Sequence, residues 1–263
     1  MILTFLIPPE RSSEKPAERT AGCTRVVYSM PNIYELIVAA VLEQAGHEVR
    51  YVDFVMDRKN RRDFDLFVSD DKSDIYLLWT VNLSIETDVE SAELIRRKRP
   101  DAFILFLGPG ATYFTNRFLS DEKMIVVRGE PEDTVTELVK EIQLDKDWLS
   151  CKGISFLSDG EIVRNPSRAL IKDLDRLPFP ARHFIEKYHY TNPKLKAHPY
   201  TTLLTSRNCP YQCIYCVPSS LTFAREIEHK AENGRKPPVY SRSVENIVAE
   251  IDYLASKKYK SIA

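Results

Sequence analysis

Three cysteines in the last quarter of the sequence are spaced to hold a single metal centre. Cys209, Cys213 and Cys216 form a Cys-x3-Cys-x2-Cys pattern. Because a cubane iron-sulfur cluster has four irons, three thiolates leave one iron open to a substrate or cofactor. Tetrahedral zinc would need a fourth ligand. The nearest candidates for that ligand, none of them at a metal-site spacing, are His198, His229 and Cys151. Three unconnected thiols are the remaining alternative.

The cysteine pattern resembles the signature of the radical S-adenosylmethionine (SAM) enzymes. The residues Ser206-Arg207-Asn208-Cys209-Pro210-Tyr211 are similar to the family's Ser-Arg-Gly-Cys-Pro-Tyr, with Asn208 in place of glycine. Asn is the next best residue for a left-handed backbone, so this departure is mild. The resemblance implies a [4Fe-4S] cluster that binds SAM at its open iron and cleaves it to a 5'-deoxyadenosyl radical. It also places Tyr215 near the adenine of SAM, although an aromatic residue there could equally be packing.

The sequence around the cysteines agrees with this interpretation. The run Tyr200 to Thr205 is apolar and β-branched, which predicts a buried strand directly before the motif. Loops at the carboxyl ends of barrel strands are where such folds keep their chemistry. The sequence therefore predicts a cluster loop at the end of a strand.

Composition limits the other function classes. The chain has 263 residues, 43% of them hydrophobic, and a net charge of −1, so nothing favours nucleic-acid binding. Five cysteines are an odd number, and Cys23 and Cys151 lie far apart, which favours a reducing cytoplasm over a disulfide framework. The apolar start, Met1 to Ile7, is too short for a signal peptide, and no apolar run is long enough to span a membrane.

The first 145 residues alternate apolar strands with amphipathic helices. This order predicts a parallel sheet covered on both faces, a doubly wound, Rossmann-like α/β domain. Gly46 is expected to close the first helix. The second helix is expected to face the sheet with Phe64, Leu66 and Phe67. The expected strands are 2–7, 48–54, 74–79, 103–107 and 124–127. The first expected helix begins at Pro31, and three further helices are expected at 57–71, 86–99 and 132–142.

Loops at the carboxyl ends of these strands are the expected ligand site, because doubly wound sheets bind ligands there. Ordinary turns are the alternative for each loop taken alone, since glycine and proline commonly follow strands. The candidate cofactor-binding residues in these loops are Thr80, Asn82, Ser84, Gly108, Gly110, Gly129 and Glu130.

The order of features in this region resembles the cobalamin-binding domain that precedes many radical SAM enzymes. The resemblance rests on the stretch 40–49, the glycines of Gly108-Pro109-Gly110, and Arg128-Gly129-Glu130 before a helix. The Asp-x-His-x-x-Gly of classical cobalamin domains is absent, so bound cobalamin should have no protein histidine on cobalt. His47 lies at the wrong end of the sheet to replace it. Small residues are expected at 108 and 110 because a corrin tail would leave no room for a Cβ.

The remainder divides into a connection, 146–198, and the N-terminal part of a radical SAM domain, 199–263. The connection contains a hairpin around Asp159-Gly160 and a proline-rich linker, 173–182. The segment 217–242 is either a functional lid or a flexible insert. Ser243 should cap a helix whose residues Val244, Ile247, Val248, Ile251 and Leu254 face inward. Together with the cluster strand, this gives the first βα unit of a partial TIM-like barrel, and Ser261 to Ala263 reads as a second strand.

These features predict a cobalamin-dependent radical SAM enzyme, most often a methyltransferase acting on carbon. The cofactors expected are a [4Fe-4S] cluster, SAM and cobalamin, with a small-molecule or peptide substrate and an electron donor such as flavodoxin or ferredoxin. The alternatives are a radical SAM cyclisation or rearrangement enzyme and a non-catalytic corrinoid or iron-sulfur binding module. Because a full barrel needs on the order of 200 residues, we expect the sequence to be a fragment of a longer enzyme.

Overall fold

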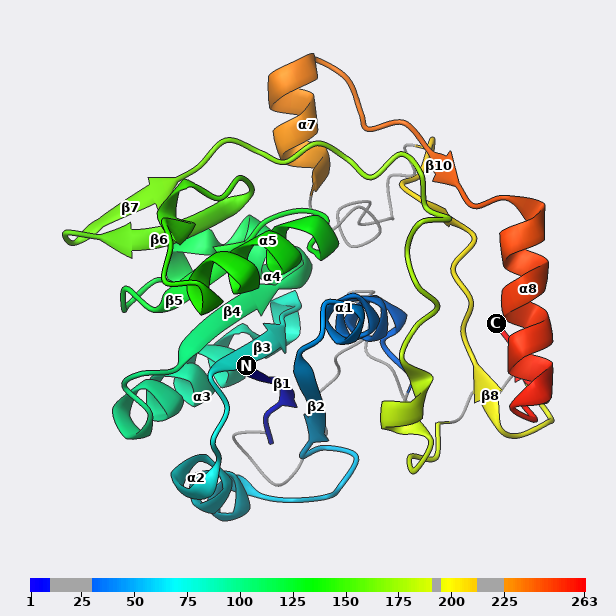
Figure 1. Cartoon of the computed structure of the whole chain (residues 1–263), viewed down its shortest axis with the longest axis horizontal. Coiled ribbons are helices and arrows are strands. Elements are labelled where there is room, and N and C mark those ends of the chain that lie inside the picture. The colour runs from blue at the N-terminus through cyan, green and yellow to red at the C-terminus, as the bar shows by residue number, and fades with distance from the viewer. Residues whose placement is uncertain (10–29, 191–194, 212–224) are drawn as a thin grey trace.

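A computed structural model describes residues 1–9, 30–190, 195–211 and 225–263. Its largest feature is a seven-stranded sheet with the order β2-β1-β3-β4-β5-β6-β7 (Figure 1). The first five strands are parallel. The strands are β1 Ile2–Ile7, β2 Glu48–Asp53, β3 Ile75–Trp79, β4 Phe103–Leu107, β5 Met124–Val127, β6 Ile154–Ser158 and β7 Glu161–Arg164.

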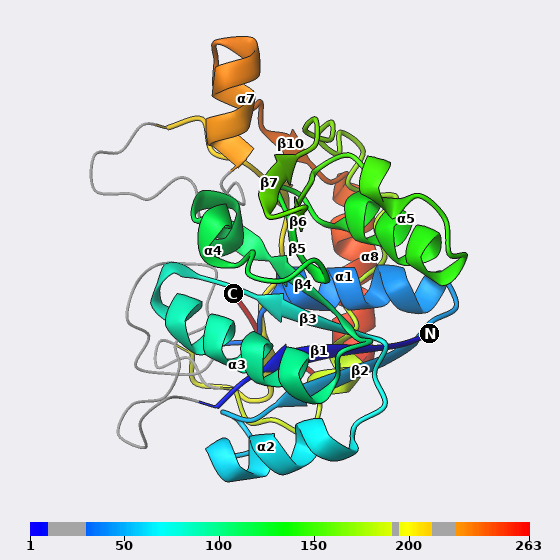
Figure 2. The same cartoon turned by 90° about the vertical axis from the view of Figure 1, so that its left-hand side faces the viewer.

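Helices cover both faces of this sheet, as Figure 2 shows from the side. One apolar core lies under α1 and α5, and a second lies under α2 and α3. The helices are α1 Ile33–Gln44, α2 Arg61–Asp70, α3 Ile85–Lys98, α4 Gly108–Tyr113 and α5 Glu132–Gln143. The predicted doubly wound α/β architecture is therefore confirmed.

Two details of the helices differ from the sequence prediction. Helix α1 begins at Ile33, two residues after Pro31, because the Asn32 side chain caps it by accepting from the backbone amides of Tyr34 and Glu35. In α2 the prediction for Leu66 was wrong, since its side chain is 56% exposed. The capping box at Asn60 sets the register of α2 so that its buried residues are Phe64 and Val68, one turn apart.

The hairpin predicted around Asp159-Gly160 is β6 and β7, and it extends the main sheet. Strand β6 pairs antiparallel with β5, and β7 pairs antiparallel with β6. The strands of the predicted connection thus share one sheet with those of the first 145 residues. The linker then packs on α1, where the Ala181 amide donates to the Leu36 carbonyl at 3.0 Å.

The last part of the described chain forms a parallel βαβ unit. Strand β8 (Tyr200–Thr201) pairs with β11 (Ser261–Ile262), and α8 (Val244–Ser256) connects them. A second pair, β9 (Ser206–Arg207) with β10 (Tyr240–Ser241), is antiparallel, and α7 spans Arg225–Asn233. This unit agrees with the predicted start of a TIM-like barrel.

The strand predicted at 200–205 is shorter in the structure. After Thr201 two carbonyls bond to side chains, because Arg182 donates to the Thr202 carbonyl and Arg242 to the Leu204 carbonyl, each at 2.9 Å. The Leu203 amide still donates to the Ala263 carbonyl at 3.0 Å. In α8, Ser243 caps the helix as predicted, through a bond from the Asn246 amide.

The predicted inward stripe of α8 was mostly wrong. Val244, Val248 and Ile251 are exposed, and the buried residues are Leu254 and the charged Glu250. The reason is that the buried contact of α8 is an ion pair between Glu250 and Arg182, described below. None of the helices in the described ranges is long and apolar enough to cross a membrane.

Candidate functional site

The carboxyl ends of β3, β4 and β5 lie at the same edge of the sheet, because these strands are parallel neighbours. We call this the carboxyl edge; its loops contain residues 80–84, 108–114 and 128–130. All seven candidate cofactor-binding residues of the sequence analysis lie there, and their role in binding remains a prediction.

The two glycines after β4 allow two loops of the edge to touch. At Gly108 the backbone is left-handed, with φ +89°, and a Cβ would lie 2.8 Å from the Thr80 carbonyl oxygen. At Gly110 a Cβ would lie 3.0 Å from the backbone of Val81. The Gly110 amide also donates to the Thr80 carbonyl at 3.0 Å. The reason we gave for small residues here, room for a corrin tail, is therefore not needed, since the protein's own backbone already requires them. The stretch also begins the short helix α4, whereas the sequence predicts a loop here, with an ordinary turn as the alternative to a ligand site.

Two of the candidate polar side chains bond within the protein. Thr80 Oγ1 donates to the Leu107 carbonyl at 3.1 Å, and the side chain is fully buried. Ser84 Oγ donates to Asp88 Oδ2 at 2.7 Å and accepts from the Val81 amide. Asn82, between them, is exposed. Thr80 and Ser84 thus fix the loop, and Asn82 presents its amide to the surface.

Exposed apolar side chains at the same edge were missed by the sequence analysis. Leu83 is 59% exposed, and Tyr113 and Phe114 are each 44% exposed. Tyr113 is the last residue of α4, and Phe114 follows it directly. Their sequence signal was a pair of aromatic residues that begins three positions after the second glycine, Gly110. Together with Asn82 they provide an apolar surface with one amide on it.

The third loop joins the carboxyl edge to the linker. Gly129 has a left-handed backbone, with φ +72°, and its amide donates to Thr112 Oγ1 at 3.2 Å. Glu130 is buried, and its Oε2 accepts from the Ile171 amide at 2.7 Å. The carboxylate of Glu130 therefore faces the interior of the protein.

A buried ion pair connects this third loop to the cysteine segment. Arg207 Nη1 donates to Glu132 Oε2 at 3.1 Å, and Nη2 donates to Glu132 Oε1. Each side chain is only 1% exposed, and Glu130 Oε1 lies 3.7 Å from Arg207 Nη1. Burial alone would lower the pKa of Arg207, but the Glu132 carboxylate raises it above its usual value, so the guanidinium stays charged. Neither residue was singled out from the sequence.

The helix α7 is attached to the same end of the sheet. Glu228 accepts from Arg164 at 2.5 Å and lies 3.2 Å from Arg128 Nε. Arg128 directly follows β5, and its Nη1 donates to Ser155 Oγ at 3.0 Å. The segment 217–242, whose alternatives were a lid or an insert, thus contains a helix held next to the carboxyl edge.

The described start of the cysteine motif has the predicted backbone. Asn208 has φ +69°, which confirms the left-handed conformation expected where the family has glycine. Its Nδ2 donates to the Pro238 carbonyl at 2.8 Å, and the half-buried Cys209 follows. Cys213, Tyr215 and Cys216 lie outside the described residues. Over the described ranges, no three or more His, Cys, Asp or Glu side chains are grouped to hold a metal ion.

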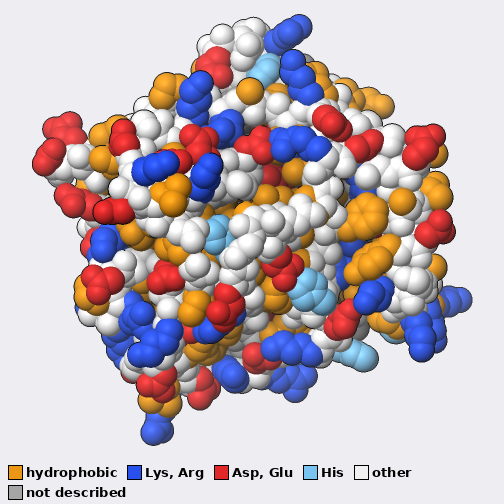
Figure 3. All heavy atoms as spheres, in the orientation of Figure 1, with side chains coloured by type: hydrophobic (Ala, Val, Ile, Leu, Met, Phe, Trp, Pro, Cys, Tyr) orange, Lys and Arg blue, Asp and Glu red, His pale blue; other side chains and the backbone are white. Residues whose placement is uncertain are grey.

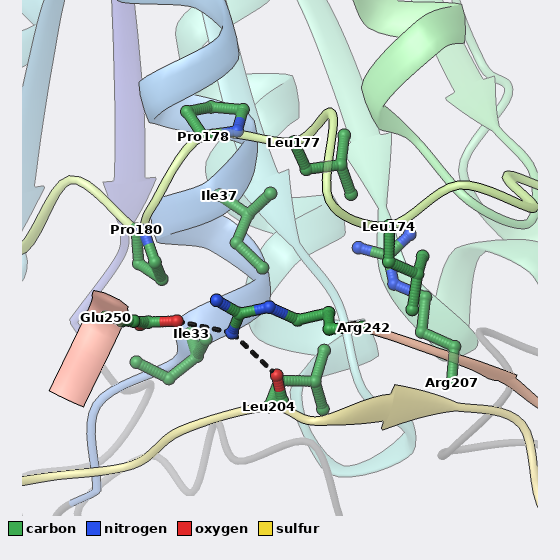
Figure 4. Close-up of a pocket in the computed structure, with 10 residues that line it drawn as sticks. All are labelled: Ile33, Ile37, Leu174, Leu177, Pro178, Pro180, Leu204, Arg207, Arg242 and Glu250. Atoms are coloured by element: carbon green, nitrogen blue, oxygen red, sulfur yellow. Dashed lines mark hydrogen bonds and ion pairs between the residues drawn. The ribbon is translucent and has the colours of Figure 1, made fainter. Parts of the chain in front are cut away.

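A second set of buried charges lies at the junction with the βαβ unit. Arg182 donates to Glu250 Oε1 at 2.6 Å and to Thr201 Oγ1 at 3.1 Å, and Arg242 pairs with the other Glu250 oxygen. Figure 4 shows a small cavity beside them, between α1, the linker and the chain after β8. Ile33 and Ile37 line it from α1, so its wall is largely apolar. It has the size of a packing defect more than that of a cofactor site.

The sequence also drew attention to His47 and Cys151. His47 immediately precedes β2, at the amino end of the parallel strands, and burial lowers its pKa. Cys151 is buried, and desolvation raises the pKa of its thiol to about 11. A thiol that stays protonated at neutral pH is a poor metal ligand.

The surface fits the composition. Basic and acidic side chains are interspersed over the face visible in Figure 3. This mixture offers no single-sign surface there for a polyanion.

The chain is similar to known proteins over nearly its whole length. Residues 19–139 match the family model of the B12 binding domain. An uncharacterized methyltransferase of Pyrococcus horikoshii is 23% identical over 256 residues, which is 97% of this chain and 50% of that protein. An anaerobic magnesium-protoporphyrin IX monomethyl ester cyclase of Synechocystis is 31% identical over 126 residues, 46% of this chain and 24% of the cyclase. The chain thus spans half or less of the length of these two relatives.

A solved structure has the same fold. The radical SAM methyltransferase TsrM of Kitasatospora setae, solved with a tryptophan substrate and a SAM analogue, superimposes with a TM-score of 0.64 at 16% identity. The match covers 99% of this chain and 46% of TsrM. TsrM has also been solved with cobalamin and a [4Fe-4S] cluster bound. Residues 19–139 therefore match a B12-binding domain, in a chain that has the fold of TsrM, a radical SAM enzyme also solved with cobalamin bound.

Proposed function

We propose that this chain belongs to a cobalamin-dependent radical SAM enzyme and contributes the sites for two of its cofactors. Cys209, Cys213 and Cys216 would bind a [4Fe-4S] cluster whose open iron binds SAM, with Tyr215 near the adenine. Cobalamin would bind at the carboxyl edge. The reaction proposed is methyl transfer to carbon, in a longer protein of which this chain is a part.

The buried pair of Arg207 and Glu132 is the observation that carries the proposal. It joins the residue two positions before Cys209 to the loop that begins at Gly129. A radical reaction that uses both cofactors needs them near one substrate, and this contact holds the two candidate sites in one unit.

The residues of the carboxyl edge fit a corrin. A corrin ring is a large, flat, mostly apolar surface with amide groups at its rim. Leu83, Tyr113 and Phe114 offer exposed apolar surface, and Asn82 offers an amide to bond with the rim. None of the three loops contains a histidine, so the fit is to cobalamin without a protein ligand on cobalt. The proposal includes passage of the corrin tail along Gly108, Gly129 and Glu130.

When bound, the cluster supplies the electron that cleaves SAM, and cobalamin carries the methyl group. The protein's task is to hold both groups and to exclude water. Helix α7, attached through Glu228 to Arg128, lies next to the carboxyl edge and contributes to that exclusion. A small-molecule or peptide substrate and an electron donor such as flavodoxin or ferredoxin complete the proposal, with a cytoplasmic location inferred from the cysteine usage.

Anaerobic reconstitution with iron and sulfide tests the cluster site. We expect broad iron-sulfur absorption and about four irons per chain. Alanine at any of Cys209, Cys213 or Cys216 should abolish it, whereas Cys151→Ala, which removes a buried neutral thiol, should not. Cys23→Ala is expected to be equally silent. Stoichiometric zinc without iron-sulfur absorption would contradict the proposal.

A second candidate function has a specific observation in its favour. The relative from Synechocystis is named as a cyclase, and its identity to this chain, 31%, exceeds that of the methyltransferase relative. The alternative is therefore a radical SAM cyclisation enzyme on the same scaffold. SAM labelled in its methyl group distinguishes the two with the full-length protein. A methyltransferase moves the label into the methylated substrate, whereas a cyclase releases 5'-deoxyadenosine and leaves the label in methionine. SAM that stays intact with both cofactors bound would favour the non-catalytic binding module.

A further inference from the structure

The side chain of Arg207 crosses from one candidate site to the other. Its backbone lies in β9, paired with Tyr240 of β10. Its guanidinium lies against the first turn of α5, where both nitrogen tips bond to Glu132. The two residues are 75 positions apart in the sequence.

This contact fixes orientation as well as distance. A guanidinium that bonds both oxygens of one carboxylate is held in a plane, which a lysine cannot reproduce. Both side chains are 1% exposed, so water cannot replace either partner. Glu130 lies 3.7 Å from the same guanidinium and is itself held by the Ile171 amide at 2.7 Å.

Each end of the contact continues rigidly into a candidate site. On one side, Asn208 alone separates Arg207 from Cys209, and its left-handed backbone and its bond to Pro238 limit its movement. On the other side, Glu130 and Glu132 follow Gly129 at the end of β5. Two residues of chain span at most about 7 Å, so the backbone of the first cysteine stays within that distance of the Arg207 backbone.

We propose that Arg207 is a positioning residue that, through Glu132, sets the place of the cluster relative to the cobalamin edge. The inference rests on the proposed function, because it presumes that both cofactors bind. Arg207 touches neither reacting group in this scheme. Its role is to hold the cysteine loop in a single position against the B12-binding domain.

Two variants test this proposal. Arg207→Lys keeps the positive charge but cannot bond both carboxylate oxygens in one plane, and Glu132→Gln keeps the shape of the side chain but loses its charge. The matched control is Glu250→Gln, because Glu250 is also 1% exposed and paired with an arginine. It joins α8 to Arg182 and Arg242. It lines the same small cavity as Arg207, but no bond of Glu250 in the described residues reaches the carboxyl edge.

The measurement is the distance distribution between the reduced cluster and cob(II)alamin, obtained by pulsed electron paramagnetic resonance on the reconstituted full chain. We expect both cofactors at wild-type stoichiometry in all variants. In Arg207→Lys and Glu132→Gln the distribution should shift or broaden by about 1 Å or more, a displacement that can cost about 100-fold in rate. Glu250→Gln should keep the wild-type distribution.

Three results would overturn the inference. The first is an unchanged distance distribution in both test variants, and the second is an equal change of the distribution in Glu250→Gln. The third is loss of only one cofactor from the test variants, which would mean that the contact supports that single site. Cofactors that fail to bind to the wild-type chain would instead refute the proposed function, so the two failures are distinguishable. Should one test variant not fold, the other carries the measurement, since each breaks the contact from a different side.

Discussion

Replacing Gly108 by alanine tests the close contact of the two loops at the carboxyl edge. The structure predicts two separate costs. The first is backbone strain, because a non-glycine residue at φ +89° costs about 1–2 kcal/mol. The second is steric, because the new Cβ would lie 2.8 Å from the Thr80 carbonyl and 3.0 Å from the Trp79 ring, both fully or almost fully buried. Overpacking of this kind costs about 1–3 kcal/mol.

Gly46→Ala is the matched control. Gly46 has nearly the same backbone, φ +86°, and nothing within 4 Å of the new Cβ. Its cost is therefore the backbone strain alone, about 1–2 kcal/mol. The free energy of unfolding, measured by urea denaturation, should fall by about 2–5 kcal/mol for Gly108→Ala, so the difference between the variants is about 1–3 kcal/mol. Equal losses in the two variants would refute the argument that Gly108 is required by its neighbours.

Three further predictions concern His47, α2 and pH. His47→Ala should leave the absorption spectrum of bound hydroxocobalamin unchanged, since His47 lies at the opposite end of the strands; a changed spectrum would mean that this histidine binds cobalt. Val68→Ala should lower the free energy of unfolding by about 1–3 kcal/mol, and Leu66→Ala by less than about 0.5 kcal/mol, because only Val68 is buried. Urea denaturation measures both losses, and a larger loss for Leu66→Ala would contradict the prediction. For Asp71, burial alone would raise the pKa of the carboxyl group, but hydrogen bonds from Ser73 and Tyr76 lower this pKa below 3.8. The ionised Asp71 carboxylate therefore contributes its full stabilisation above about pH 3.8, and this contribution disappears as the pH falls through the lower, folded-state pKa. The free energies of unfolding of wild type and Asp71→Asn should consequently converge in acid. Parallel curves of stability against pH would contradict this.

The sheet was predictable from the sequence because its signals are local. A run such as Phe103 to Leu107 is too apolar to be an edge strand, and the structure buries four of its five residues fully. Asn208 was predictable for the same reason, since a left-handed residue depends on its own backbone. The buried face of α8 was not predictable, because a stripe of apolar residues shows which side of a helix could be buried but does not show which element covers it.

The contacts between the candidate sites were not predictable. Arg207 and Glu132 are separated by 75 positions, and nothing in either residue's surroundings marks it as paired. The glycines at 108 and 110 were noticed for their type, but their neighbours are set by how the loop after β3 folds. Sequence spacing thus identified the chemical groups, and the tertiary structure was needed to relate them.

The charges on β2 and β7 have a consequence for how the molecule behaves at high concentration. These are the two edge strands of the main sheet, where unpaired backbone groups could pair with another chain. Glu48 and Arg50 occupy one edge and pair with each other at 2.6 Å, and Glu161 and Arg164 occupy the other. A second sheet could add to either edge only by desolvating these charges, which opposes fibre-like stacking of copies of the protein.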